Sequence, residues 1–382
     1  MNGATRSTVR QGREEPQVSG RKAHVVFDMM SARGYVTGAK VYAEELAEAL
    51  RARGQVQVTC ISASPAKRQG GIWNVWNIVR HFLWTQVVLP LKLLRMRADL
   101  VHTFSFAPVL SPCPVILTLY DTLYLTHPEH YRNKVIPLYT KLLIAAAVRR
   151  ANVLCTISKF SQREIASSYK VPADRIPIVY PGVSARYALP SAVEVATIRK
   201  KYSLPSKFFL FVGAWGRRKN LPRLIDAFRI LLQQECGDLK LIMVGASSGS
   251  SEVEDRLRDP DTARHTSLLG FVPDEDMPPI YAACEALIFP SLGEGFGLPV
   301  VEAMACGSPV LLSRASCLPE VAGDAALYFD PEDPADIARA MSEFLHSDLS
   351  QDLRRRGLER ARLFDWNNAA LESERVYVDV LR

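Results

Sequence analysis

Two glutamates flank a glycine-rich turn in the segment 290–310, PSLGEGFGLPVVEAMACGSPV. Glu294 precedes the Gly-x-Gly turn, and seven residues separate it from Glu302. Pro299 suits the first position of a helix, and Gly307 suits the position that ends it. The amides at a helix N-terminus attract an anion, and the helix dipole strengthens that attraction. The segment therefore predicts a site for a diphosphate, as a nucleotide would supply.

We expect this site to be lined by Phe296 and by the backbone amides of Gly297, Leu298 and Val300. Pro299 has no N–H and cannot contribute. The alternative, a capped helix with solvated carboxylates, does not account for the Gly-x-Gly turn. A dinucleotide-binding turn fits less well, because GEGFGLPV lacks the third glycine of that fingerprint and no strand-end acid follows it.

A second group of charges stands in GRRKN, residues 216–220, directly after the apolar run FVGAW. Arg218 and Lys219 would neutralise the negative charge of a bound diphosphate, and preformed cations do this well in a cleft that excludes water. A solvated basic turn at the end of a strand is the alternative. The position between a strand and a helix favours contact with phosphate.

These residues must be positioned by strands and helices, and from residue 23 onward short apolar runs alternate with helical stretches. Apolar strands alternating with helices indicate a parallel sheet covered on both faces. One series begins with AHVVFDM, followed by a helix from about Gly38 to Arg53, and a second begins with FFLFVGA, followed by a helix from about Leu221 to Gln234. Two doubly wound lobes with a cleft between them are expected, and ligands bind such lobes at the carboxyl ends of the strands.

The predicted domains follow from these two series. They are a disordered tail at 1–22, an N-terminal Rossmann-like lobe at 23–190, a C-terminal Rossmann-like lobe at 191–363, and a C-terminal helix at 364–382 that packs back toward the first lobe. A chain of 382 residues is long enough for two domains.

Seven scattered cysteines, an odd number, fit reduced thiols. The first 22 residues have no apolar region and do not form a secretory signal. No uninterrupted run of 18 apolar residues occurs. These features predict a cytoplasmic protein without a membrane span.

The net charge of +7 is unevenly distributed, because residues 67 to 99 contain only one acid, Asp99. The same segment contains Trp73, Trp76 and Trp84 and six basic residues, Lys67, Arg68, Arg80, Lys92, Arg95 and Arg97. It could rest on an anionic membrane surface, as a peripheral protein does at the inner face of the membrane. Ordinary packing with a solvated rim explains the pattern equally well.

Several segments together resemble family 4 retaining glycosyltransferases (glycosyl transferases group 1), which have the two-lobed GT-B fold. The resemblance rests on GYVTGAKVYAEELAEAL, ISKFSQREIA, IPIVYPGVS, FVGAWGRRKNLPRLIDAF, LLGFVPDEDMPPIYAACEALIFPSLGEGFGLPVVEAMACGSPVLLS and LPEVAGDAALYFDP, which extend over most of the chain. It implies an α/β protein with two Rossmann-like parallel-sheet lobes facing a central cleft.

The resemblance also implies roles for the charged residues. Glu294 would bind hydroxyls of the transferred sugar, and Glu302 would bind two adjacent ribose hydroxyls. Arg218 and Lys219 would hold the donor diphosphate. Gly38 would let the first lobe approach the donor phosphates, although a glycine at a helix N-terminus needs no such function.

The acceptor side departs from the family pattern. Asp121 follows the strand VILTLY, where the family commonly has a His-Asp pair, and Tyr120 replaces the histidine. Asp121 is expected to bind the acceptor or to cap its loop, and any acid/base role of the missing histidine is in doubt.

The expected function is transfer of a hexose, mannose-type or similar, from a nucleotide diphosphate sugar to a hydroxyl acceptor. The acceptor would be a saccharide or lipid-linked saccharide in cell-surface polysaccharide or glycolipid synthesis, and no nucleic-acid partner is expected. The alternatives are a nucleotide-sugar epimerase of the same fold and a catalytically silent sugar-nucleotide binding protein.

No cofactor and no metal are expected, since the nucleotide sugar is a substrate. His127 and His130 in HPEH have metal-like spacing but no companion ligands. The run Asp274, Glu275 and Asp276 is placed to begin a helix, where Asp is a common cap.

Overall fold

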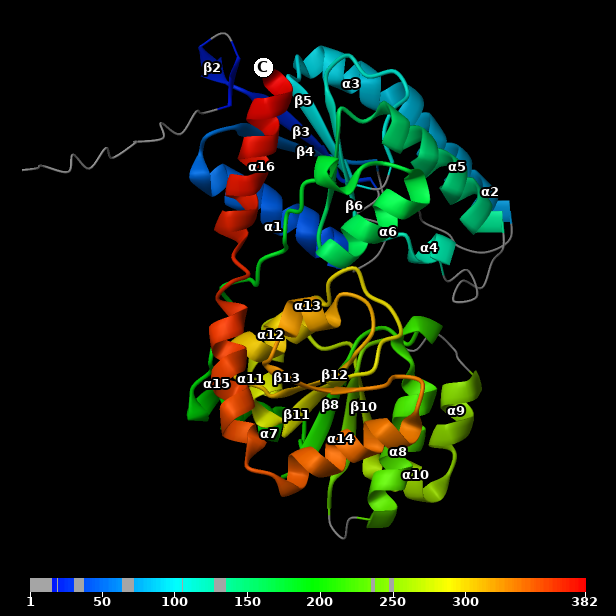
Figure 1. Ribbon diagram of the computed structural model, residues 1–382, viewed down its shortest axis with the longest axis vertical. Coiled ribbons are helices and arrows are strands. Elements are labelled where there is room, and N and C mark those ends of the chain that lie inside the picture. The colour runs from blue at the N-terminus through cyan, green and yellow to red at the C-terminus, as the bar shows by residue number, and fades with distance from the viewer. Residues whose placement is uncertain are drawn as a thin grey trace, which may run out of the picture.

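The computed structural model describes residues 16–18, 20–30, 38–63, 72–104, 106–126, 135–234, 238–246 and 251–382. The protein has two lobes, one above the other in Figure 1, and each is a parallel sheet with helices packed on its faces. The sheet of the first lobe has the strand order β4-β3-β5-β6-β7, and that of the second has the order β10-β9-β8-β11-β12-β13. The predicted GT-B architecture of two doubly wound lobes is confirmed.

The strands of the first lobe are short, and most of their residues are buried because helices cover both faces of the sheet. They are β3 (His24–Asp28), β4 (Gln57–Ile61), β5 (Leu100–Phe104), β6 (Val115–Leu119) and β7 (Val153–Thr156). Their connections are α1 (Gly38–Arg53), α2 (Ile72–Leu83), α3 (Leu89–Met96), α4 (Leu123–Thr126), α5 (Val135–Arg150), α6 (Lys159–Tyr169) and the 3-10 turn η3 (Ala173–Arg175). A π-helical segment, η1 (Trp84–Val88), joins α2 to α3.

The second lobe repeats this organisation. Its strands are β8 (Phe208–Val212), β9 (Lys240–Val244), β10 (Thr266–Gly270), β11 (Ala286–Phe289), β12 (Val310–Ser313) and β13 (Ala326–Phe329). Its helices are α7 (Ala192–Lys201), η4 (Arg217–Lys219), α8 (Leu221–Gln234), α9 (Ser251–Leu257), α10 (Pro260–His265), α11 (Met277–Ala283), α12 (Leu298–Ala305), α13 (Leu318–Ala322), α14 (Pro334–His346) and α15 (Leu349–Ala361).

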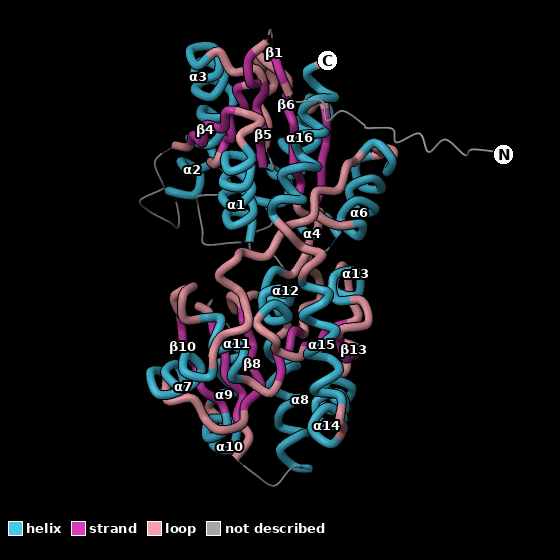
Figure 2. Tube along the Cα trace, turned by 90° about the vertical axis from the view of Figure 1, so that its left-hand side faces the viewer, coloured by secondary structure: helices cyan, strands magenta, loops and turns pink. Residues whose placement is uncertain are grey.

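The last helix, α16 (Trp366–Leu381), leaves the second lobe and packs beside α1 of the first, as both views show (Figures 1 and 2). Arg53 of α1 forms an ion pair of 2.9 Å with Glu374, which is buried. The hydroxyl of Tyr377 lies 2.8 Å from Nδ1 of His102 inside the first lobe. The helix therefore ties the C-terminus to the first sheet.

The prediction of a disordered tail at 1–22 was wrong for its last residues. β1 (Gln17–Val18) and β2 (Arg21–Lys22) pair as an antiparallel hairpin, and Gly20 turns between them with a φ of 78°. Glycine adopts this left-handed conformation without steric cost. The hairpin packs near α16, so a contact distant in sequence orders it.

Within the described part of the chain, no helix combines the length and the apolar character needed to cross a bilayer. The cysteines that the structure describes are free thiols.

Candidate functional site

The strand order brings two loops of the second lobe together. β8 and β11 are parallel neighbours, so the loops that follow them leave the same edge of the sheet. Asn220, with a φ of 57°, ends the 3-10 turn after β8, and its side-chain amide donates to the carbonyl oxygen of Pro290 at 3.1 Å. The amide of Leu292 donates to the carbonyl oxygen of Arg218 at 2.9 Å. These bonds hold residues 217–220 against the segment that carries Glu294.

Glu294 is buried and is the centre of a partly buried ion cluster at this edge. Its carboxylate accepts a hydrogen bond from Nζ of Lys219 at 2.8 Å and forms an ion pair with Arg218. Arg218 also donates to the carbonyl oxygen of Gly293, and the Lys219 ammonium lies 4.5 Å from the ring centroid of Phe289. The structure therefore brings the predicted basic pair and the first predicted glutamate into direct contact.

Burial and the neighbouring charges have opposite effects on the pKa values of this cluster. Burial by itself would raise the pKa of Glu294, but Lys219 and Arg218 hold it at about 2. Burial lowers the pKa of Lys219, and the Glu294 carboxylate opposes that effect. Two basic side chains therefore surround the one ionised carboxylate of Glu294, an arrangement that suits an anionic ligand.

The glutamate-bearing helix, α12, begins at Leu298, one residue before the predicted start at Pro299. Gly297 precedes it with a φ of 95°, and a Cβ atom there would come within 3.0 Å of the Leu318 side chain. Glycine is therefore required at this turn. The amides of Gly297 and Leu298 lie at the helix N-terminus, where intrahelical acceptors are absent.

Val300 and Phe296 do not line this turn as predicted. The amide of Val300 donates to the carbonyl oxygen of Gly297 at 2.9 Å, so it is already used inside the turn and is removed from the predicted set of anion donors. The Phe296 ring is buried in an aromatic cluster with Tyr180 and Phe364. Its side chain packs in the interior, so it does not present a surface to a ligand.

Glu302 lies one turn into α12. The hydroxyl of Tyr281, from α11, donates to Oε2 of Glu302 at 2.9 Å. The Tyr281 ring packs edge-on against Tyr187. Burial raises the pKa of Glu302 to about 7, Tyr281 and Arg186 lower it, and Asp274 raises it further. Sequence analysis missed both tyrosines, which come from segments distant in the chain.

The first lobe faces this edge with the start of α1. A Cβ atom on Gly38 would lie 3.6 Å from Cδ1 of Leu298, so the N-termini of α1 and α12 meet where the two lobes face each other. The Tyr120 hydroxyl donates to the carbonyl oxygen of Ala39 at 3.0 Å. Its ring is stacked on Phe104. Tyr120 therefore holds the first turn of α1 and is packed, which differs from the predicted position facing an acceptor.

Asp121 lies two residues after the end of β6 and faces the second lobe. Its Oδ1 accepts the amide of Leu123 at 3.0 Å and so caps the short turn α4. Burial raises the pKa of Asp121, and the Arg218 cation opposes this shift. A Cβ atom on Gly295 would come within 2.7 Å of the Tyr120 carbonyl oxygen and 3.4 Å of Oδ2 of Asp121. The loop that carries Glu294 thus approaches the segment after β6 so closely that only glycine fits.

Two polar side chains that sequence analysis did not single out connect the lobes here. Ser161 Oγ donates to the carbonyl oxygen of Tyr120 at 2.7 Å and approaches that of Gly295 at 3.4 Å. Glu320, on α13 of the second lobe, accepts the amides of Lys159 and Phe160 at 2.7 and 3.0 Å. These amides form the N-terminus of α6 in the first lobe, where a carboxylate is favoured.

The acidic run at 274–276 has other partners than predicted. Asp276 precedes α11 but makes no side-chain cap, and instead accepts hydrogen bonds from Lys201 and Tyr202, each at 2.6 Å. Arg186 lies 3.7 Å from Asp274 and 3.7 Å from Glu45 of α1. His127 and His130 lie outside the described residues.

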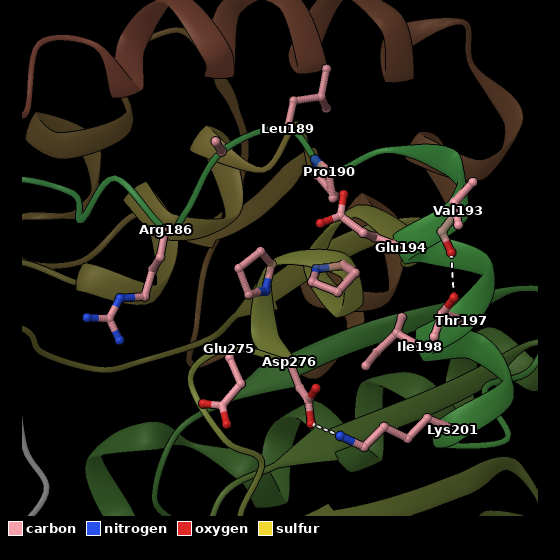
Figure 3. Close-up of a pocket in the computed structure, with 13 residues that line it drawn as sticks. Arg186, Leu189, Pro190, Val193, Glu194, Thr197, Ile198, Lys201, Glu275 and Asp276 are labelled. Carbon is pink, nitrogen blue, oxygen red and sulfur yellow. Dashed lines mark hydrogen bonds and ion pairs between the residues drawn. The ribbon is translucent and has the colours of Figure 1, made fainter.

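A separate pocket of about 460 Å³ lies beside α7 and the start of α11, and contains none of the predicted site residues. Figure 3 shows the hydrogen-bonded Lys201–Asp276 pair on one side of the lining and Leu189 on the opposite side. Its lining mixes acids, cations and apolar groups, with Glu194, Ile198 and Pro278 among them.

Two family models and a curated relative match this chain. The family model described as Glycosyl transferases group 1 matches residues 194–363, and the model described as Glycosyltransferase Family 4 matches residues 36–187. The O-antigen chain mannosyltransferase B of Escherichia coli is 34% identical over 265 residues, which cover 69% of this chain and 69% of that protein.

Solved structures share the fold at low sequence identity. The sucrose-phosphate synthase of Thermosynechococcus elongatus superposes with a TM-score of 0.74 at 18% identity, covering 94% of this chain and 99% of the other. HepE of Anabaena, in complex with UDP and glucose, superposes with a TM-score of 0.71 at 18% identity, covering 93% and 99% of the two chains.

Proposed function

Because the chain belongs to the family of group 1 glycosyl transferases, and is a glycosyltransferase, we propose that it transfers mannose or a similar hexose from a nucleoside diphosphate sugar. The acceptor is a hydroxyl of a saccharide or lipid-linked saccharide in cell-surface polysaccharide or glycolipid synthesis. The mannose assignment draws support from the relative named as an O-antigen chain mannosyltransferase. The nucleotide donor draws support from the UDP complex of a protein with the same fold.

The observation that carries the proposal is the buried contact of Lys219 and Arg218 with Glu294 beside the N-terminus of α12. Two cations and the amides of Gly297 and Leu298 can share a diphosphate, because their combined charge exceeds that of the one carboxylate. Glu294, held ionised, accepts hydrogen bonds from hydroxyls of the transferred sugar. Glu302, one turn into α12, accepts those of the ribose.

Transfer proceeds with retention at the anomeric carbon. The bond between that carbon and the diphosphate oxygen breaks, and its electron pair stays on the oxygen. The acceptor hydroxyl oxygen forms the new glycosidic bond on the same face, and its proton passes to the departing phosphate oxygen. Lys219 and Arg218 stabilise the charge that develops there. Asp121 binds the acceptor hydroxyl in this proposal.

No metal ion is needed in this scheme, because the cations of the protein neutralise the leaving group. We expect turnover to persist in the presence of EDTA. Loss of turnover on chelation, restored by a divalent cation, would contradict this part of the proposal.

The function is tested by offering UDP and GDP forms of mannose and glucose to the purified protein, with and without a mannose-terminated oligosaccharide. The expected result is an acceptor-dependent product whose anomeric configuration, read by NMR, matches that of the donor. Glu294→Gln is the control and should reduce product strongly. Conversion of the donor without an acceptor would instead identify an epimerase, and donor binding without any turnover would identify a silent binding protein.

A further inference from the structure

The exposed large apolar side chains of this protein are concentrated on one helix. The outer helix, defined as residues 72–96, comprises α2, η1 and α3. Among the described residues it carries eight of the sixteen exposed large hydrophobic side chains, with exposed fractions from 37% to 59%. These eight, the apolar face, are Trp76, Val79, Phe82, Leu83, Val87, Val88, Leu91 and Leu94.

The opposite side of the outer helix is firmly anchored to the first lobe. Leu89 and Leu93 are buried, and the buried Trp84 donates from Nε1 to Oδ1 of Asp28 at 3.0 Å. Asp28 ends β3, so this bond ties the helix to the sheet itself. The outer helix is therefore firmly packed on one side, and the apolar face on its other side is exposed to solvent.

A neighbouring loop extends the apolar face. Gln86, within the outer helix, donates to the carbonyl oxygen of Ala107 at 3.3 Å and accepts the amide of Val109 at 2.8 Å. The next two side chains of that loop, Val109 and Leu110, are 51% and 79% exposed. An apolar patch of this extent on a protein surface marks a binding surface.

Charge near the apolar face has a single sign. Residues 72–98 contain no aspartate or glutamate, and Lys92, Arg95 and Arg97 are exposed near the end of the outer helix. The Lys92 ammonium lies 5.6 Å from the ring centroid of Trp84. Long basic side chains beside an apolar stripe can reach lipid phosphates while their stems stay in the apolar layer.

We propose that the apolar face, together with Val109 and Leu110, seats the first lobe on an anionic lipid bilayer. From Trp76 to Leu94 the face runs for about 27 Å along the helix, at about 1.5 Å per residue. Such a long, shallow stripe with cations and no acids fits the interface of a bilayer, where a helix lies parallel to the surface. Figure 1 shows α2 and α3 on the outer side of the first lobe, so the second lobe stays free to bind its donor.

The test is cosedimentation of the full chain with vesicles of phosphatidylcholine alone and of phosphatidylcholine mixed with phosphatidylglycerol. Binding to the anionic vesicles should be stronger, and added salt should weaken it. Replacing Lys92 and Arg95 together by Gln should weaken binding roughly ten- to thirty-fold. The double variant Leu91→Glu, Leu94→Glu should weaken it by at least about ten-fold, because carboxylates replace apolar contacts.

Val193→Glu is the matched control, since Val193 is 75% exposed on α7 of the second lobe. It should bind vesicles as the unchanged protein does. All variants should keep their activity toward a soluble saccharide acceptor, which separates this proposal from the proposed function.

Equal binding of the unchanged protein to neutral and anionic vesicles would overturn the proposal. So would unchanged binding by both double variants. A third result would also overturn it. If the unchanged protein self-associates, the Leu91→Glu, Leu94→Glu variant is a monomer and neither binds vesicles, the apolar face joins two copies of the chain.

Discussion

The ammonium of Lys219 lies 2.8 Å from the carboxylate of Glu294, although 75 positions separate the two residues in the chain. The contact exists because β8 and β11 are adjacent in the second sheet and both residues follow these strands. Glu294 is 7% exposed, so the pair is shielded from water. The attraction between the two charges is therefore stronger than it would be in water. In the proposed function, this preformed cluster is where the donor diphosphate binds.

Replacing Lys219 by alanine should lower kcat/KM for the donor on the order of ten- to a thousand-fold, through loss of a charge-assisted contact to the leaving group. Steady-state kinetics with varied donor measure this directly. Arg217→Ala, an exposed cation on the same 3-10 turn, is the matched control and should retain near-normal kinetics. Equal behaviour of the two variants would remove Lys219 from the site.

The raised pKa of Glu302 should make the free energy of unfolding depend on pH. Burial raises the pKa of its carboxyl from 4.5 to about 7, so between these values the folded protein holds a proton that the unfolded chain has released. The free energy of unfolding should therefore fall as the pH rises through this window, by up to about 3 kcal/mol. Glu302→Gln, neutral at every pH, should lose this fall. Urea unfolding at several pH values tests it, and parallel pH profiles would contradict it.

The same carboxyl should control donor affinity. Ribose hydroxyls donate best to an ionised carboxylate, so the affinity for a nucleotide sugar should rise as the pH passes about 7. Tyr281→Phe removes a hydrogen bond that lowers the pKa of Glu302 and should move this rise to higher pH. Calorimetric titration measures both effects. An affinity that is independent of pH in the unchanged protein would exclude Glu302 from ribose binding.

Glu320 should control closure of the cleft. Its carboxylate, from the second lobe, accepts two amides at the N-terminus of α6 and the Tyr180 hydroxyl at 2.8 Å. Glu320→Gln removes the charge from this helix cap, which costs about 0.5–2 kcal/mol. The lobes should separate more readily, with a larger radius of gyration in X-ray scattering and a donor KM raised roughly three- to ten-fold, since the loss corresponds to about one kcal/mol.

Glu343→Gln is the control for Glu320, because Glu343 pairs only on the surface of α14 with Arg339 of the same helix. It should change neither scattering nor KM. If Glu320→Gln behaves like this control, the contact of Glu320 with α6 forms because the lobes are close together and does not hold them there.

Local patterns were sufficient for much of the fold. The helices at Gly38–Arg53 and Leu221–Gln234 have the predicted bounds, because glycine, amphipathic spacing and flanking apolar runs act within a few residues. The glycine-rich turn before α12 was also predicted, since Gly297 has a positive φ that its sequence context signals.

Contacts between distant segments could not be predicted in this way. The hairpin at Gln17–Lys22 depends on packing near α16, and the Glu320 link depends on how the lobes meet. The Val300 amide was predicted to be available to an anion, but it donates inside a tight turn whose geometry no spacing rule specifies. Sequence indicated which residues carry charge, and strand order decided which of them touch.

Tyr120 provides the last prediction, because the structure gives its hydroxyl a definite partner. The hydroxyl donates to the carbonyl oxygen of Ala39 at 3.0 Å, next to Gly38, which faces Leu298 of the second lobe. Tyr120→Phe should cost about 1 kcal/mol of stability by losing this bond. The start of α1 would then be held less firmly, and the donor KM should rise roughly three- to ten-fold with kcat nearly unchanged, since about one kcal/mol corresponds to such a factor.

Tyr120→His distinguishes this positioning role from proton transfer. Burial raises the pKa of the Tyr120 phenol well above its usual value, so it stays protonated throughout the neutral range. An imidazole has an unperturbed pKa of about 6.5 and would leave polar nitrogens partly buried beside Phe104. We therefore expect His to destabilise the protein more than Phe, as thermal unfolding would show. Higher turnover in Tyr120→His, with a new pH midpoint near neutrality, would mean that the side chain at this position reaches the acceptor after all.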